Sequence, residues 1–167
     1  MFPTIVKDNF FKNVNEIIEY SKTLKYNKPL KKEGWFGLRT KSIHKDNYKL
    51  FNDIIISVLK LYCFKNFSFK NSKVCFSKLK YGDKHKFHYH RDYEYILAAV
   101  IYLSEGDIKG GTTIFEKNNK KQIIVGNTFN SIVAYDGNKI HGYTSLVPFK
   151  NKERLTLNIF IGDIQCT

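Results

Sequence analysis

The sequence is poor in cysteine, in arginine and in long apolar runs, and each shortage excludes a class of protein. Its three cysteines form no C-x-x-C pair, and their odd number favours free thiols in a reducing compartment over a disulfide scaffold. The longest apolar stretch, ILAAVIYL at 96–103, is far shorter than the roughly 20 residues that span a bilayer. The opening MFPTIVKDNFFKN lacks the basic segment and apolar run of a secretory signal. We therefore expect a cytoplasmic protein with no membrane partner.

Arginine is scarce although the chain is strongly basic. Lysine and arginine together number 28 against 15 acidic residues, giving a formal net charge of +13, yet arginine occurs only as Arg39, Arg91 and Arg154. Such a charge can attract nucleic acid or another polyanion. The lysines are scattered, however, and arginine dominates most phosphate recognition. Lysine, asparagine, isoleucine, phenylalanine and tyrosine all have A/T-rich codons, so their abundance favours compositional bias, and a nucleic-acid partner stays an alternative.

A single domain of residues 1–167 fits the length and the composition. The chain is 43% hydrophobic, and no repeat, low-complexity tract or linker divides it. Residues 1–65 contain two runs with helical spacing, for which Asp8 and Asp46 are the expected N-caps. In residues 66–167, short β-rich runs alternate with turn signals, as in a sandwich or barrel. The predicted fold class is mainly β with N-terminal helices (α+β): a jelly-roll core flanked by a helical support region.

The segment FHYHRD at 87–92 holds the first candidate metal ligands. On a strand, residues i and i+2 point to the same side, so His90 and Asp92 would be close enough to share one ion. A third ligand must come from elsewhere, and His141 is the one histidine further along the chain. Two histidines and one carboxylate on one side of an ion form the facial triad that suits non-haem Fe(II) oxygen chemistry.

The run ERLTLNIFI at 153–161 carries a candidate anion site. If it is a strand, Arg154, Thr156 and Asn158 share one face, and the leucines between them share the other. An arginine on an inward face is costly unless an anion meets it. A dicarboxylate can do so through a bidentate pair, and the Thr156 hydroxyl adds a donor. The alternative is an outward-facing arginine at the end of a strand.

Taken together, these segments resemble the Fe(II)- and 2-oxoglutarate-dependent dioxygenases, specifically the prolyl 4-hydroxylase-like branch. The matching parts are HRD at 90, AAVIYLSE at 98, GGTTIFE at 110, His141 and RLT at 154. The resemblance implies a double-stranded β-helix (jelly-roll) core. It also implies His90, Asp92 and His141 as the iron ligands and the catalytic residues.

The same resemblance implies how the co-substrate binds and what the reaction is. Arg154 would pair with the distal carboxylate of 2-oxoglutarate, assisted by Thr156, and Tyr102 and Tyr81 match tyrosines that lie near the co-substrate in the family. The implied reaction hydroxylates an unactivated C–H bond with Fe(II), 2-oxoglutarate and O2, releases succinate and CO2, and takes ascorbate as a supporting reductant. The implied substrate is a peptidyl proline or a similar group, in a peptide, a protein or a small molecule.

Three alternatives stay open. A cupin-type metal-dependent oxygenase or isomerase would use His88, His90, Glu94 and His141, because the first three have the strand parity of the candidate aspartate. A nucleic-acid oxidative demethylase of the same superfamily would suit the charge, but those enzymes carry a second arginine a few residues past the first, and none follows Arg154 here. A non-catalytic jelly-roll binding module would need no intact triad.

Overall fold

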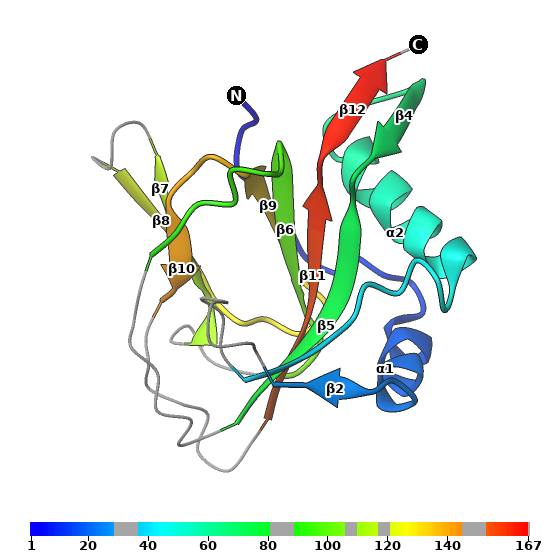
Figure 1. Cartoon of the computed structure of the whole chain (residues 1–167). Coiled ribbons are helices and arrows are strands. Elements are labelled where there is room, and N and C mark those ends of the chain that lie inside the picture. The colour runs from blue at the N-terminus through cyan, green and yellow to red at the C-terminus, as the bar shows by residue number, and fades with distance from the viewer. Residues whose placement is uncertain (29–36, 81–88, 106–109, 117–120, 145–152, 167) are drawn as a thin grey trace.

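The computed structural model describes residues 1–28, 37–80, 89–105, 110–116, 121–144 and 153–166. Within them, the elements in chain order are β1 (Ile5–Lys7), α1 (Val14–Lys22), β2 (Tyr26–Asn27), β3 (Leu38–Thr40), α2 (Tyr48–Lys60), β4 (Phe67–Lys70), β5 (Lys73–Lys80), β6 (Leu97–Tyr102), β7 (Thr112–Glu116), β8 (Lys121–Val125), β9 (Ile132–Asp136), β10 (His141–Tyr143), β11 (Glu153–Ile161) and β12 (Asp163–Cys166). Figure 1 shows the helices on one side of a large sheet and a small sheet on the other. The prediction of a mainly β chain with N-terminal helices is confirmed.

Strands pair antiparallel throughout the described residues. The large sheet has the order β1-β9-β6-β11-β5-β3-β2, the small sheet has the order β10-β7-β8, and β12 pairs with β4 in a two-stranded ribbon. At the centre, β11 lies between β6 and β5, so Thr156 is opposite both Tyr102 and Ser77. The short strands β1, β2 and β3 join the same sheet. The N-terminal region therefore contributes strands to the large sheet as well as helices to its outer face.

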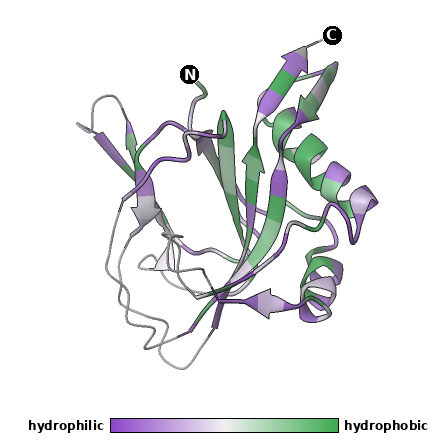
Figure 2. Cartoon of the chain, viewed as in Figure 1, coloured by the Kyte–Doolittle hydropathy of each residue, from purple (hydrophilic) through white to green (hydrophobic). Residues whose placement is uncertain are grey.

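Helix α2 covers the outer face of the large sheet with a stripe of apolar side chains. At helical spacing it buries Phe51, Ile54, Ile55, Val58 and Leu59. Figure 2 shows hydrophobic residues concentrated on this helix and on the central strands behind it. Within the described part of the chain, no helix is long and apolar enough to cross a membrane.

The caps of both helices differ from the prediction. Asn47 caps α2, with its side chain accepting a hydrogen bond from the Leu50 N–H at 3.0 Å. Asp46 lies one residue earlier, where its own N–H bonds to the Ile43 carbonyl in the preceding turn. Asp8 does not cap α1, because the next residue, Asn9, has a φ of 51°, which is incompatible with a right-handed helix. The helix therefore begins only at Val14.

The two faces of β11 carry different chemistry, as the alternation in its sequence predicts. Leu155, Leu157 and Ile159 pack into the apolar core with the helices. Arg154 and Asn158 line a cavity on the opposite face, between the large and small sheets. Arg154 is only 4% exposed, so the prediction of an inward-facing arginine is confirmed.

Candidate active site

The three candidate metal ligands converge in space. The ligand atoms of His90, Asp92 and His141 all lie within 4.8 Å of one another. Nε2 of His90 is 3.7 Å from Oδ1 of Asp92, and Nε2 of His141 is 3.2 Å from Oδ2 of the same carboxylate. Metal–ligand bonds of about 2.1 Å at right angles would place neighbouring ligand atoms roughly 3 Å apart. The group therefore has nearly the spacing that a single six-coordinate ion requires.

Backbone hydrogen bonds hold these residues in place. His90 and His141 form an isolated antiparallel bridge, in which each backbone N–H donates to the other's carbonyl at 2.9 Å. The Asp92 N–H donates to the Gly137 carbonyl at 2.9 Å, and the Asp92 carbonyl accepts from the Tyr95 N–H at 2.8 Å. Asp92 thus lies in a turn, and the prediction that His90 and Asp92 share a strand is wrong. The chain turns away after His90 because the backbone of Asp92 pairs with the end of β9.

The polar atoms at this point suit a cation. Nδ1 of His141 lies 2.9 Å from the Lys139 carbonyl, so it carries the proton and donates it, which leaves the lone pair of Nε2 for a metal. Oδ2 of Asp92 is buried and has no hydrogen-bond partner among the described residues. A carboxylate oxygen buried without a donor is costly, and a bound cation would remove that cost. Two imidazole nitrogens and one carboxylate fit Fe(II).

A cavity of about 340 Å³ lies beside the three ligands. Several strands deliver its polar and aromatic wall, which includes Arg39, Thr112, Tyr135, Tyr143, Arg154 and Asn158. This volume is at the lower end of the range for small-molecule sites in proteins, and it suits a ligand of a few carbon atoms.

Arg154 is a buried cation that projects into this cavity. Its Cζ lies 4.9 Å from the ring centroid of Tyr143 and 5.3 Å from that of Tyr102, so the guanidinium is flanked by two aromatic rings. Among the described residues, its buried Nε has no hydrogen-bond partner, and no carboxylate forms an ion pair with it. A guanidinium in this state calls for an anionic ligand.

Two further predicted residues lie near Arg154. Tyr102 is fully buried, and its hydroxyl donates to Oγ1 of Thr112 at 2.7 Å. Burial raises the pKa of Tyr102 above its ordinary value, so the phenol keeps its proton and acts as a donor. Thr156 is on the same face of β11, but its hydroxyl is buried and accepts from Nδ2 of Asn158 at 3.4 Å. It does not belong to the described cavity wall.

The remaining sequence candidates have different outcomes. Tyr81 and His88 lie outside the described residues. Glu94 is exposed and is not one of the described ligands that converge, which favours the aspartate-based triad over the cupin set. Tyr143 was missed, although its position two residues after His141 places both on one face of β10. Thr112, which is opposite Tyr143 on β7, was missed too, because only the observed strand register reveals that pairing.

No protein-family model matches the chain, and no curated protein does. Among solved structures, a prolyl-4-hydroxylase from Pseudomonas putida matches 96% of this chain and 92% of its own, with a TM-score of 0.65 and 16% identity. An oxidoreductase of the 2OG-Fe(II) oxygenase family from Burkholderia pseudomallei matches 95% and 84%, at a TM-score of 0.68 and 12% identity. A prolyl hydroxylase from Trichoplax adhaerens, in complex with a hypoxia inducible factor peptide fragment, matches 96% of this chain and 83% of its own, with a TM-score of 0.64 and 12% identity. In fold, the chain therefore resembles the 2OG-Fe(II) oxygenases and, among them, the prolyl 4-hydroxylases.

Proposed function

We propose that this protein is an Fe(II)- and 2-oxoglutarate-dependent oxygenase, built on a double-stranded β-helix, that hydroxylates an unactivated C–H bond. One observation carries the proposal: a buried guanidinium without a counter-ion among the described residues lines the same cavity as a His–Asp–His group. The metal group alone would fit several kinds of oxygenase. The added anion site, together with the fold, supports 2-oxoglutarate as the co-substrate.

In this proposal His90, Asp92 and His141 hold Fe(II). They would occupy one side of the ion and leave the other side for the co-substrate and O2. When bound, iron and 2-oxoglutarate supply the oxidation of the C–H bond, with release of succinate and CO2. His141 would bind the metal through the lone pair of Nε2, because Nδ1 of that ring is engaged by the Lys139 carbonyl.

Arg154 would pair with the distal carboxylate of 2-oxoglutarate. A bidentate, charge-assisted pair uses the geometry of the guanidinium, and the rings of Tyr102 and Tyr143 hold that group in place and exclude water. Tyr102 and Thr156 stay the proposed additional donors, but the Tyr102 hydroxyl would first have to turn away from Oγ1 of Thr112, and Thr156 lies outside the described cavity wall. Tyr81, proposed for the same role, lies outside the described residues.

The substrate we propose is a peptide or protein side chain, with proline as the first candidate. Supporting this choice, the Trichoplax neighbour is a prolyl hydroxylase with a bound peptide fragment. Arg39 reaches the cavity from β3, where its Nε donates to Oγ of Ser77 at 3.0 Å, and it is the candidate residue for contact with the substrate. The cytoplasmic location expected from the composition stays a prediction.

Anaerobic addition of Fe(II) and then 2-oxoglutarate tests the proposal directly. We expect a visible absorption band that requires both, and succinate formation once O2 and a proline-containing peptide are supplied. Asp92→Ala should abolish both signals, while the neighbouring His88→Ala should retain most of the succinate formation. Loss in the His88 variant with none in the Asp92 variant would support the cupin arrangement instead. Iron binding without any effect of 2-oxoglutarate would contradict the proposal.

A further inference from the structure

Residues 136–141, here called the ligand turn, position two of the three candidate metal ligands, Asp92 and His141, through hydrogen bonds to the backbone carbonyls of the turn. The Gly137 carbonyl accepts from the backbone of Asp92, and the Lys139 carbonyl accepts from the ring of His141. The turn is closed by the Lys139 N–H, which donates to the Asp136 carbonyl at 2.9 Å. The geometry of the metal group therefore depends on where this turn is held.

A polar cluster around the buried Lys139 anchors the ligand turn on its far side. The Lys139 side chain is only 5% exposed, and its Nζ lies 2.6 Å from Oε1 of Glu116 on β7 and 3.0 Å from Oγ1 of Thr4. The Thr4 hydroxyl in turn donates to the same Glu116 oxygen at 2.5 Å. The N-terminal segment also contacts the turn directly, since the Phe2 N–H donates to Oδ2 of Asp136 at 2.9 Å.

A contribution to stability does not by itself explain this cluster. Burying the Lys139 ammonium beside a partly exposed glutamate removes a charge from water, and apolar side chains of similar size often stabilise such a position as well or better. An ion pair is, however, directional: it fixes where the ammonium lies and thereby restrains the backbone of Lys139. The restrained backbone atom that matters is the carbonyl that orients His141.

We propose that the Thr4–Glu116–Lys139 cluster is a positioning device for the metal site. It holds the ligand turn so that the Lys139 carbonyl keeps the His141 ring in the tautomer and orientation that direct Nε2 at the metal. Lys139 touches neither metal nor substrate in this scheme and acts through His141. The inference rests on the proposed metal site and does not depend on which substrate is oxidised.

The test is the affinity of the metal-free protein for Co(II), measured by visible absorption under anaerobic conditions. Changes in groups that orient metal ligands typically cost about 10–100-fold in metal affinity, and we expect Lys139→Met to weaken Co(II) binding to that extent. Glu116→Gln should weaken it in the same direction, and Lys139→Arg should restore most of the affinity. With ¹⁵N-labelled histidine, NMR should show His141 protonated at Nδ1 in the wild type and a mixture of tautomers in Lys139→Met.

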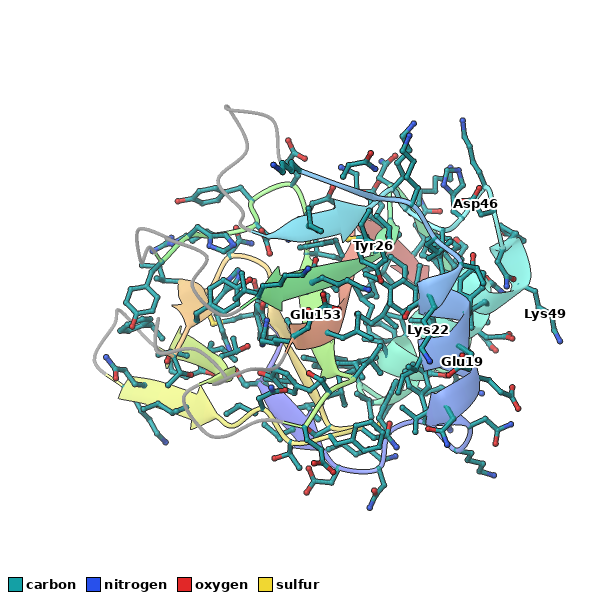
Figure 3. All side chains as sticks on the ribbon, turned by 90° about the horizontal axis from the view of Figure 1, so that it is seen from below. Glu19, Lys22, Tyr26, Asp46, Lys49 and Glu153 are labelled. Atoms are coloured by element: carbon teal, nitrogen blue, oxygen red, sulfur yellow. The ribbon has the colours of Figure 1, made fainter. Side chains whose placement is uncertain are left out.

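The matched control is Lys22→Met. Lys22 pairs with Glu19 on α1, but these side chains are 60% and 69% exposed, and Figure 3 shows both on the outside of the helix. This variant should bind Co(II) like the wild type. A folded Lys139→Met protein with wild-type Co(II) affinity would overturn the inference. If that variant does not fold, Thr4→Val removes only one hydroxyl of the cluster, and unchanged affinity there overturns it equally.

These outcomes separate the positioning role from the proposed function. If the wild type binds Co(II) but forms no succinate from 2-oxoglutarate, the oxygenase proposal fails and the positioning role stands or falls on the variants. If the wild type binds no Co(II), both fail.

Discussion

Replacing Arg154 with methionine tests the anion site, because it removes the guanidinium and keeps an unbranched apolar stem. A charge-assisted hydrogen bond contributes about 1.5–3 kcal/mol, so losing the pair should raise the 2-oxoglutarate KM by roughly 10- to 100-fold. The matched control is Arg39→Met, which removes the other arginine of the cavity wall. The control should leave the 2-oxoglutarate KM close to that of the wild type, because we assign Arg39 to substrate contact.

The effect of Arg154→Met on the free energy of unfolding should differ from the effect of breaking an ordinary buried ion pair. Removing one partner of a buried pair costs about 3–5 kcal/mol, because the other charge is left alone. Arg154 has no such partner among the described residues, and the substitution removes its packing against two aromatic rings, worth about 0.5–2 kcal/mol for each ring. Relief of a desolvated charge offsets that cost. We therefore expect the free energy of unfolding of the metal-free protein to change little.

Ligand-induced stabilisation should disappear instead. At a concentration of 2-oxoglutarate about 100 times its Kd, binding stabilises the wild type by about 2.7 kcal/mol, and a 100-fold weaker Kd leaves about 0.4 kcal/mol. For a domain of this size the difference corresponds to a Tm shift of roughly 5–9 °C. Thermal unfolding with Mn(II), with and without 2-oxoglutarate, measures it. An Arg154→Met protein that keeps the full shift, or that loses several kcal/mol without ligand, would refute the assignment.

Three other variants test separate parts of the site. Gly137→Ala should abolish Co(II) binding and lower the free energy of unfolding by about 1–3 kcal/mol in chemical denaturation, because a Cβ there would lie 2.0 Å from the Tyr95 carbonyl oxygen; wild-type behaviour would contradict the observed turn. Burial alone would raise the pKa of Glu116, but hydrogen bonds from neighbouring donors outweigh it and lower the pKa below the ordinary 4.5. The Glu116 carboxylate therefore stabilises the fold above pH 4.5, and this contribution is lost as the pH falls through the pKa of the folded state. Glu116→Gln should flatten the pH dependence of the free energy of unfolding in that acid range. An unchanged slope would argue against this role of Glu116. Tyr143→Leu removes a ring 4.9 Å from Arg154 and should raise the 2-oxoglutarate KM up to about tenfold, whereas Tyr143→Phe keeps the ring and should not.

The sequence predicted the parts of the site that depend on local alternation. The spacing in ERLTLNIFI placed Arg154 inward and Leu157 in the helix-side core, as the structure shows. The same argument placed Tyr102 on the cavity side of β6, where its ring faces the guanidinium. Period-two patterning works here because each of these strands is buried on both faces, so each residue's parity decides its environment. The roles assigned to these residues stay predictions.

The parts that could not be predicted depend on contacts between distant segments. His90 and Asp92 do come together with His141, but the geometry is made by a bridge and by a bond to Gly137, not by a shared strand. No local pattern encodes either bond, since both join segments far apart in the sequence. The Lys139 ion pair could not be predicted for the same reason: a lysine in a turn ordinarily faces water, and here it is buried by contacts with β7 and with the N-terminal segment.

The separate anchoring of His141 and Arg154 has a practical consequence for redesign. His141 is fixed by its pairing with β7 and with His90, and Arg154 by its pairing with β5, so neither position depends on the length of the chain between them. The chain between these two positions can therefore vary in length and sequence while the candidate metal ligands and the buried guanidinium keep their places.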